Sequence, residues 1–208
     1  VNCSGSAIGF GDVETQYNAL LQAWYGGQAA GLAVADVLFG DYNPAGRLPV
    51  TFYKSTDQLP DFENYDMEGR TYRYFRGEPL YAFGYGLSYT TFEYGNATLS
   101  RNSIKAGKGV KVSIPVTNSG KYDGDEVVQV YVKSLDNPDA PIKSLKGFKR
   151  VNIAAGTTAT VTIELDSKAF EFYDESVDEL APRAGKYQIL YGSSSNESDL
   201  KALDFEVI

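Results

Sequence analysis

Residues 110–117 read Val-Lys-Val-Ser-Ile-Pro-Val-Thr, and residues 158–165 read Thr-Ala-Thr-Val-Thr-Ile-Glu-Leu. In both stretches every second residue is apolar, which is the period of a β-strand that buries one face. Similar runs occur at 126–133, 185–191 and 203–207. Residues that favour turns lie between these runs, and no helical period interrupts them. From about Gly95 onward the sequence therefore predicts an antiparallel β-sandwich of the immunoglobulin or fibronectin type III kind.

The part of the chain before Gly95 follows a different pattern. Trp24 lies four residues after Leu20 and three after Leu21, a spacing that predicts a helix over 13–25. Residues 28–39 predict a second helix that ends at Gly40, and their small side chains would let its backbone lie close on a sheet. A short extended run follows at 48–52. These elements predict an α/β fragment ahead of the sandwich.

Residues 53–93 show no clear period and are rich in tyrosine, glycine and proline. A long irregular segment in a compact domain is usually functional or wrapped over a surface. We expect this segment to tie the two halves together. The predicted domains are residues 1–93, with the α/β fragment and the aromatic tie, and residues 94–208, with the sandwich.

Composition excludes several kinds of chemistry. Lys plus Arg total 19 and Asp plus Glu total 27, so the net charge is −8, and a nucleic-acid partner is not expected. The chain contains no histidine, which removes Ser-His-Asp catalysis and histidine-ligated zinc. The one cysteine, Cys3, permits no internal disulfide and is expected to be a buried, inert thiol. We therefore predict no metal and no cofactor.

The chain carries no apolar run near the ~20 residues that a membrane-spanning helix needs, so no membrane span is predicted. It begins at Val1 rather than at Met, which we interpret as a processed or artificial boundary. A secreted precursor could have lost its signal peptide, so these features leave the compartment open.

Longer motifs carry a resemblance to a known family. Residues 23–31 (AWYGGQAAG) and 38–51 (LFGDYNPAGRLPVT) resemble glycoside hydrolase family 3, at the end of its α/β-sandwich domain. Residues 79–92 (PLYAFGYGLSYTTF) are similar to the hinge that leads into the C-terminal fibronectin type III-like domain of that family. The segments 145–148 and 185–187 match landmarks of that last domain. The motif GRTYRY at 69–74, together with Leu59-Pro60, looks most like the β-xylosidase branch.

The resemblance implies a function for the intact protein. Enzymes of this family are retaining exo-β-glycosidases, which need two carboxylates ~5–5.5 Å apart. The resemblance places the nucleophilic Asp in an N-terminal barrel and the acid/base in the second domain upstream of Val1. No residue here matches either motif, so we assign no catalytic residue and expect the isolated chain to be inactive. The resemblance also implies that an oligosaccharide substrate binds through the upstream domains, and that the protein is periplasmic or secreted. The oligomeric state is not predicted.

Two residues are candidates for binding substrate in the intact enzyme. Arg70 and Tyr72 could line the wall of the sugar site, since guanidinium groups donate to hydroxyls and aromatic rings stack on sugars. The alternative that we favour for the arginines is structural: Arg70 and Arg73 would pair with nearby acids and hold the loop. For Trp24, a core position is favoured over a platform for sugar.

Acidic residues offer weaker candidates. Glu63, Asp66 and Glu68 could flank a sugar, but a solvated acidic loop is the favoured interpretation. A second cluster could attract calcium, yet its spacing matches no calcium loop, and we interpret it as a solvated face. Its members are Asp174, Glu175, Asp178 and Glu179.

Two other functions stay open. The aromatic content would also suit a carbohydrate-binding β-sandwich module, although no planar aromatic row is evident. A non-catalytic structural surface domain is the third possibility. Saturable binding of xylo-oligosaccharides would indicate the carbohydrate-binding module. Independent folding of the sandwich would indicate the structural surface domain.

Overall fold

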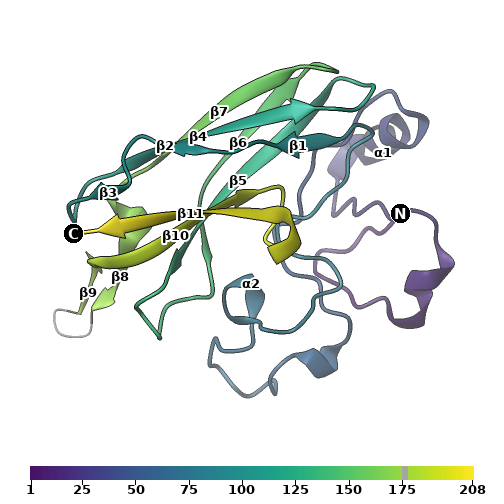
Figure 1. Ribbon diagram of the computed structural model, residues 1–208. Coiled ribbons are helices and arrows are strands. Elements are labelled where there is room, and N and C mark those ends of the chain that lie inside the picture. Colours follow the sequence, from purple (N-terminus) through teal and green to yellow (C-terminus); the bar gives the residue numbers. More distant parts are fainter. Residues whose placement is uncertain (175–177) are drawn as a thin grey trace.

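The computed structural model describes residues 1–174 and 178–208, without the side chains of Asp12 and Glu14. Two sheets face each other in the second part of the chain (Figure 1). In the first sheet β4 pairs with β1, β2 and β7, and the second sheet has the order β3-β11-β10-β5-β6. All neighbours are antiparallel except β3 and β11. The strand bounds in the first sheet are β1 Phe92–Tyr94, β2 Thr98–Leu99, β4 Val110–Asn118 and β7 Thr158–Leu165; in the second they are β3 Ser103–Ile104, β5 Gly124–Ser134, β6 Ser144–Ile153, β10 Gly185–Gly192 and β11 Leu200–Val207.

The core of the sandwich lies between the inner faces of these sheets. Val112, Ile114 and Val116 of β4 are fully buried, and Val128 and Val130 of β5 lie in the same apolar cluster. Burying each such side chain contributes roughly 1.5–3 kcal/mol. The period-two runs of the sequence are therefore strands, and the predicted antiparallel sandwich is confirmed.

Six of the described strands lie outside the predicted runs: the short strands β1, β2 and β3, and also β6, β8 and β9. Strand β6 is an edge strand whose middle is exposed, so its apolar residues do not alternate and Phe148 faces solvent. Strands β8 (Glu171–Asp174) and β9 (Glu179–Pro182) form a separate two-stranded hairpin. Phe172 of this hairpin stacks on Tyr187 of β10, which fixes the hairpin against the end of the sandwich.

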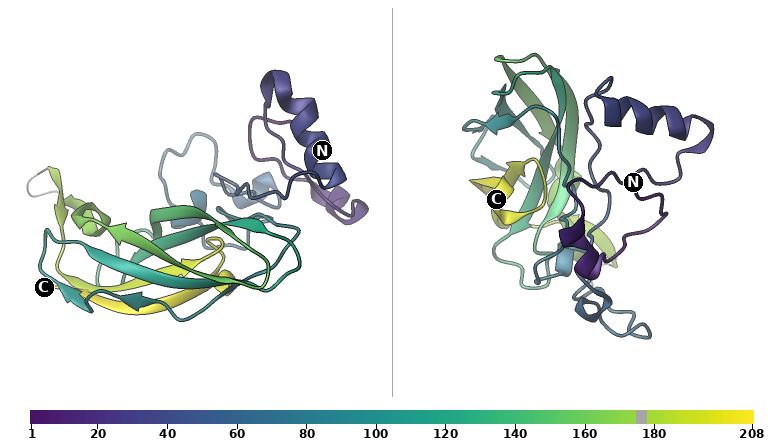
Figure 2. Two further views of the ribbon diagram at one scale, coloured as in Figure 1. Left: turned by 90° about the horizontal axis from the view of Figure 1, so that it is seen from above. Right: turned by 90° about the vertical axis from the view of Figure 1, so that its right-hand side faces the viewer.

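In the first part of the chain, the second predicted helix is confirmed. A 3-10 turn at Gly27–Ala29 leads into helix α1, Ala30–Phe39. Gly40 ends it with a φ of 86°, a left-handed conformation that glycine adopts without steric cost. Figure 2 shows α1 standing away from the sandwich in both views, and none of its residues is buried.

The helix predicted over 13–25 is wrong. Only a 3-10 helix, Gly11–Gln16, forms there. The chain then runs extended to Gln22, which pairs with Asn2 in a parallel bridge, and Trp24 adopts a φ of 55°. The bridge satisfies backbone groups that a helix would have paired locally, so a contact distant in sequence outweighs the local apolar spacing.

The prediction of a buried Cys3 is also wrong. Cys3 is exposed, because it follows the bridged Asn2 and its side chain points to the opposite side of the extended chain. Trp24 is half-buried, and its ring lies edge-on to Phe52 at 6.4 Å between centroids, as a packing residue does.

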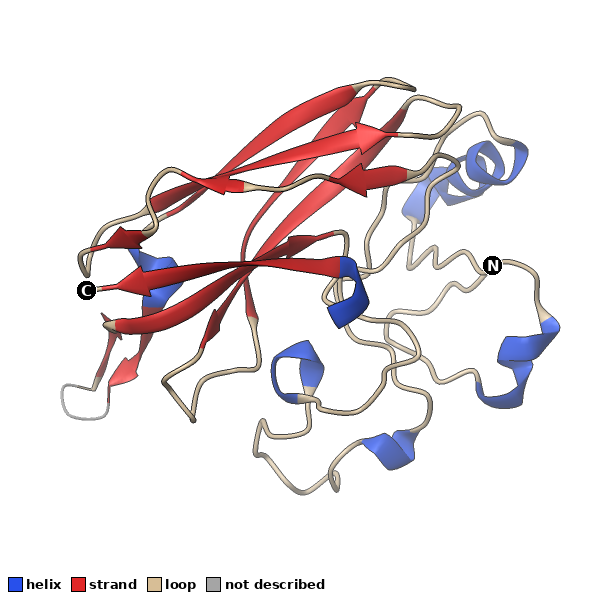
Figure 3. Cartoon of the chain, viewed as in Figure 1, coloured by secondary structure: helices blue, strands red, loops and turns tan. Residues whose placement is uncertain are grey.

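Residues 40–91 are mostly loop (Figure 3). They contain a 3-10 turn at Thr56–Gln58, the single helical turn α2 (Thr71–Tyr74) and a bridge between Phe52 and Tyr81. The remaining 3-10 turns are Ser167–Phe170 and Glu197–Asp199. Within residues 1–174 and 178–208, no helix has both the length and the apolarity needed to cross a bilayer.

Candidate functional site

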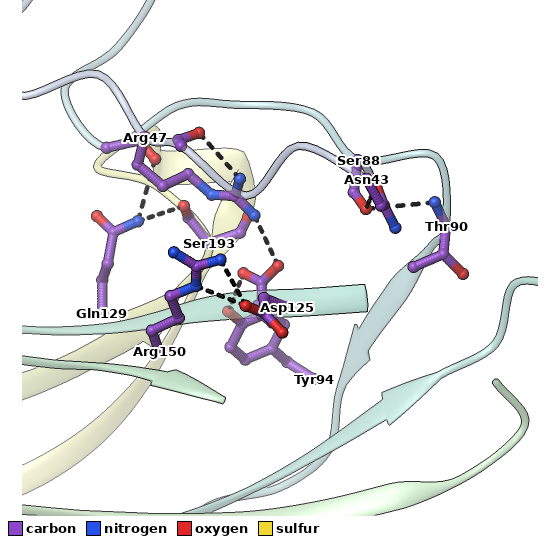
Figure 4. A network of polar contacts seen from close by, with 12 residues as sticks. Asn43, Arg47, Ser88, Thr90, Tyr94, Asp125, Gln129, Arg150 and Ser193 are labelled. Carbon is purple, nitrogen blue, oxygen red and sulfur yellow. Dashed lines mark hydrogen bonds and ion pairs between the residues drawn. The ribbon is translucent and has the colours of Figure 1, made fainter. Parts of the chain in front are cut away.

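A buried ion pair joins the two halves of the chain (Figure 4). Nη2 of Arg47, in the first part, lies 2.7 Å from Oε2 of Glu126 at the start of β5, and the two side chains are 8% and 2% exposed. The hydroxyl of Tyr94 in β1 donates to the other carboxylate oxygen at 2.7 Å. Burial, followed by the charge of Glu126, raises the pKa of Tyr94, so Tyr94 stays a neutral donor. Arg47 Nε is buried without a hydrogen-bond partner.

Gln129 forms a second connection on the outer face of β5. Its Nε2 donates to the carbonyl of Gly84 at 3.0 Å and to that of Ser193 at 2.5 Å. Its Oε1 accepts from the Tyr131 hydroxyl at 2.5 Å. Because all three polar contacts of this buried amide are made, the loop at Gly84 is held in one position against the sheet.

A third set of contacts lies nearer the surface. Arg150 of β6 donates to Asp125 at 2.6 Å and to the hydroxyl of Tyr42 at 2.6 Å. Asn43 donates to the Asp123 carbonyl at 3.1 Å and accepts from Ser88, which Figure 4 shows beside it. The segment 42–47 is therefore fixed to the sandwich at several points.

Tyr72 lies inside the junction between the tie and the sandwich. Its ring stacks on Phe83 with centroids 4.2 Å apart and meets Tyr131 edge-on at 5.9 Å. Its hydroxyl accepts from the backbone N–H of Leu145 at 2.9 Å. Burial raises the pKa of Tyr72. It also borders a cavity of about 280 Å³, near Phe75 and the buried Lys143, whose ammonium pairs with Glu197.

Arg70 holds the loop that precedes α2. Its guanidinium donates to the backbone carbonyls of Asp61, Asn64 and Asp66 at 3.2, 2.7 and 3.2 Å. Arg70 therefore holds this loop through backbone carbonyl oxygens, and the predicted pairing of Arg70 and Arg73 with nearby acids is wrong. Among the residues that the structure describes, neither Arg70 nor Arg73 forms an ion pair, and Arg73 instead lies over the ring of Tyr74 at 5.6 Å.

The acidic candidates do not assemble into a site. Glu63, Asp66 and Glu68 are exposed. Asp174 and Glu179 are paired across β8 and β9, and Asp178 accepts a hydrogen bond from Tyr173. Glu175 lies outside the described residues. In the described part of the chain, no group of three His, Cys, Asp or Glu is placed to hold a metal ion.

The sequence interpretation missed Arg47, Glu126 and Gln129, although one signal was present. Glu126 lies in the same phase of β5 as the buried Val128 and Val130. An acidic residue on the inward face of a strand requires a buried partner, because an unpaired buried charge is costly. The identity of that partner could not be read from the sequence.

Comparisons with known proteins agree with this architecture. The glycosyl hydrolase family 3 C-terminal domain matches residues 1–89, and the fibronectin type III-like domain matches residues 126–195. A xylan 1,4-beta-xylosidase from Xylanibacter ruminicola is 53% identical over 203 residues, which cover 98% of this chain and 23% of that protein. A beta-xylosidase from Formosa agariphila is 38% identical over 210 residues, with 98% and 29% covered.

Solved structures give the same result. A beta-glucosidase from Kluyveromyces marxianus in complex with glucose superimposes with a TM-score of 0.86 at 35% identity, covering 100% of this chain and 26% of that chain. A beta-glucosidase from Listeria innocua in complex with isofagomine gives 0.83 at 31% identity, with 98% and 30% covered. The chain spans about a quarter of the length of these relatives.

The fold thus combines the end of an α/β domain with a fibronectin type III-like sandwich, joined by a buried polar junction. The chain belongs to glycoside hydrolase family 3, whose members among its relatives are β-xylosidases and β-glucosidases, and it corresponds to their C-terminal part.

Proposed function

We propose that this chain is the C-terminal portion of a retaining exo-β-glycosidase that removes terminal β-linked sugars, β-xylosides in the first place, from oligosaccharides. The hydrolytic carboxylates would lie in domains outside these residues. The chain itself would act as a brace that holds the α/β domain, and with it one wall of the sugar pocket, in a fixed position. The observation that carries this role is the buried Arg47–Glu126–Tyr94 contact, since it fixes residues next to α1 to the sandwich.

Exposed apolar surface on the first part of the chain supports the existence of further domains. Phe39 of α1 is 85% exposed, and Phe62 and Tyr65 in the loop before α2 are 97% and 92% exposed. Large aromatic side chains in such positions usually contact another surface. We propose that α1 packs on the remaining sheet of the α/β domain and that the loop over 61–67 faces the catalytic domain.

Arg70 and Tyr72 would shape the substrate side of this loop. The three carbonyl contacts of Arg70 hold the loop in one form, and the stacking of Tyr72 on Phe83 positions its base. We propose that both residues support sugar binding. Arg70 would do so by holding the loop and also by contacting the sugar itself. A periplasmic or secreted location, which the resemblance to the family implies, belongs to the same proposal.

The direct test compares the 208-residue chain with the full-length polypeptide that contains it. We expect no release of p-nitrophenol from aryl β-xylosides by the isolated chain and steady release by the full-length polypeptide. An aryl β-glucoside run in parallel ranks the two sugars. Turnover by a contaminant-free preparation of the isolated chain, or none by the full-length polypeptide on either substrate, would reject the proposal.

A further inference from the structure

A cavity lies beside α2, where the tie meets the loop before β6 and the turn before β11 (Figure 1). Its volume is about 280 Å³. That is close to the lower end of the ~300–1,000 Å³ typical of sites for small molecules, and far above the ~10–15 Å³ that one water molecule needs. The cavity therefore has room for a compact organic molecule.

Backbone hydrogen bonds hold the walls of this cavity in place. The N–H of Ile142, in the loop before β6, donates to the carbonyl of Arg73 at 2.7 Å. The N–H of Ser195, in the turn before β11, donates to the carbonyl of Phe83 at 2.9 Å. Because these bonds join the two sandwich loops to the tie, the cavity is preformed, and binding would need little rearrangement.

A buried hydroxyl belongs to the lining of the cavity. Thr51 is 6% exposed, and its Oγ1 is buried with no hydrogen-bond partner among the residues that the structure describes. Leaving such a group without a partner is costly, whereas valine would fill the same space at no such cost. A partner that enters the cavity would explain why a hydroxyl occupies this position.

A buried ammonium group lines the cavity as well. Lys143 is 5% exposed, and it pairs with Glu197, whose own side chain is 71% exposed. An ammonium carries three N–H donors, so one contact with a solvated carboxylate leaves two for other acceptors. A buried cation is stabilised by further hydrogen bonds, which an acceptor inside the cavity would supply.

The charges that line the cavity favour an anion. Arg76 and Lys143 contribute two positive charges, and Glu197 contributes one negative charge, so the sum is 2 − 1 = +1. Arg76 is exposed at the rim and forms no ion pair in the described part of the chain. It would therefore attract an anion by its charge and would not act as a buried donor.

The remaining walls are largely apolar. Tyr72 stacks on Phe83, and Phe75, Pro79 and Ile142 extend this surface. An inorganic anion would leave these side chains uncovered, whereas a carboxylate on a compact apolar body would contact both them and the polar groups.

We propose that this cavity binds a small monocarboxylate with an apolar body. The hydroxyl of Thr51 and the ammonium of Lys143 would donate to the carboxylate, and the aromatic walls would cover the apolar body. This site is independent of the proposed function, because it involves neither the hydrolytic carboxylates nor the sugar.

The test is isothermal titration calorimetry of the full-length polypeptide with benzoate at pH 7, where the acid is ionised. We expect saturable binding of one benzoate per chain. Benzamide, which keeps the ring and lacks the charge, should bind about tenfold more weakly or worse, and so should acetate, which keeps the charge and lacks the ring.

Substitutions in the cavity locate the binding. Thr51→Val keeps the shape of the side chain and should raise the dissociation constant for benzoate about three- to tenfold. Its thermal midpoint should not fall, since the hydroxyl that it removes has no protein partner. Lys143→Met should raise the dissociation constant about tenfold or more, and Arg76→Gln, at the exposed rim, should raise it less. Thr98→Val and Arg101→Gln are matched controls at exposed positions outside the cavity and should bind as the wild type does.

Three results would overturn the proposal. The first is no binding of benzoate by the wild type, which would mean that the cavity holds only water. The second is equal affinity for benzoate and benzamide, because the cations would then select no anion. The third is an unchanged dissociation constant in Thr51→Val and Arg76→Gln, which would place the benzoate elsewhere. Thermal unfolding of every variant establishes that it is folded, and Thr51→Val keeps the test decisive if Lys143→Met does not fold.

Discussion

Arg47 and Glu126 lie 79 residues apart in the sequence and form a 2.7 Å ion pair across the junction of the two halves. Glu126 also accepts from Tyr94, so both of its carboxylate oxygens have a partner. A buried charge that loses its partner costs far more than an exposed one, because water no longer solvates it. This pair therefore decides how firmly the α/β segment is fixed to the sandwich.

Replacing one member of this pair should destabilise the chain strongly. We expect Arg47→Met to lower the free energy of unfolding by ~3–5 kcal/mol, since Glu126 is left buried and partly unpaired. The double variant Arg47→Met/Glu126→Leu should recover much of the loss because no charge remains. Urea unfolding followed by Trp24 fluorescence and by circular dichroism measures both. The exposed pair of Lys111 and Glu164 supplies the control: Lys111→Met should cost at most ~1 kcal/mol. Equal losses in the two single variants would contradict the assigned role.

Alkaline pH should weaken the junction through Tyr94. Because its pKa is raised, the folded chain keeps this proton at a pH where the unfolded chain loses it. The contribution of Tyr94 to the free energy of unfolding is therefore complete below about pH 10, the pKa of an unfolded tyrosine. Above that pH it declines by ~1.4 kcal/mol per pH unit. Tyr94→Phe should reduce this slope, whereas Tyr122→Phe, at an exposed position, should not. Urea midpoints from pH 8 to 11 test this. An unchanged slope in Tyr94→Phe would count against a raised pKa of the buried Tyr94 hydroxyl.

Gly84 is expected to tolerate no side chain. It has a φ of 81°, and a Cβ there would lie 2.0 Å from Oε1 of Gln129, which cannot move without losing its three hydrogen bonds. Gly156 has a similar φ of 72° but open space around it. Gly156→Ala should therefore cost only the backbone strain of ~1–2 kcal/mol, while Gly84→Ala should cost ~2 kcal/mol more. Comparable thermal midpoints for the two variants would show that Gln129 does not hold this loop.

Arg70 is expected to affect substrate binding in the full-length enzyme. Arg70→Ala removes the guanidinium that holds the loop through three carbonyls, so we expect KM for an aryl β-xyloside to rise severalfold and kcat to change less. Steady-state kinetics measure both constants, and Arg101→Ala is the control because Arg101 is exposed and lies outside this loop. If KM and kcat both stay unchanged while the thermal midpoint falls, Arg70 has a structural role alone.

Much of the sandwich was predictable because the pattern that marks each strand lies within the strand's own residues. A strand that buries one face must place apolar residues at every second position, so Val110 to Val116 and Ala159 to Leu165 reveal their strands without knowledge of the partner. The same holds for α1 and for Gly40, whose left-handed conformation suits a helix end. The boundary at 93/94 and the sugar-binding roles of Arg70 and Tyr72 stay predictions.

Other features depend on contacts that no local pattern encodes. The predicted helix over 13–25 has the apolar spacing of a helix, yet Gln22 pairs with Asn2, and β6 is a strand because β5 offers it an edge. The amino-acid sequence by itself determined which residues are apolar, how they alternate, and that histidine chemistry is absent. Only the tertiary structure decided that Glu126 meets Arg47 and that Arg70 donates to backbone carbonyls. The physical reason is that the alternation of a strand is written in its own residues, whereas the partner of a side chain follows from how distant segments pack.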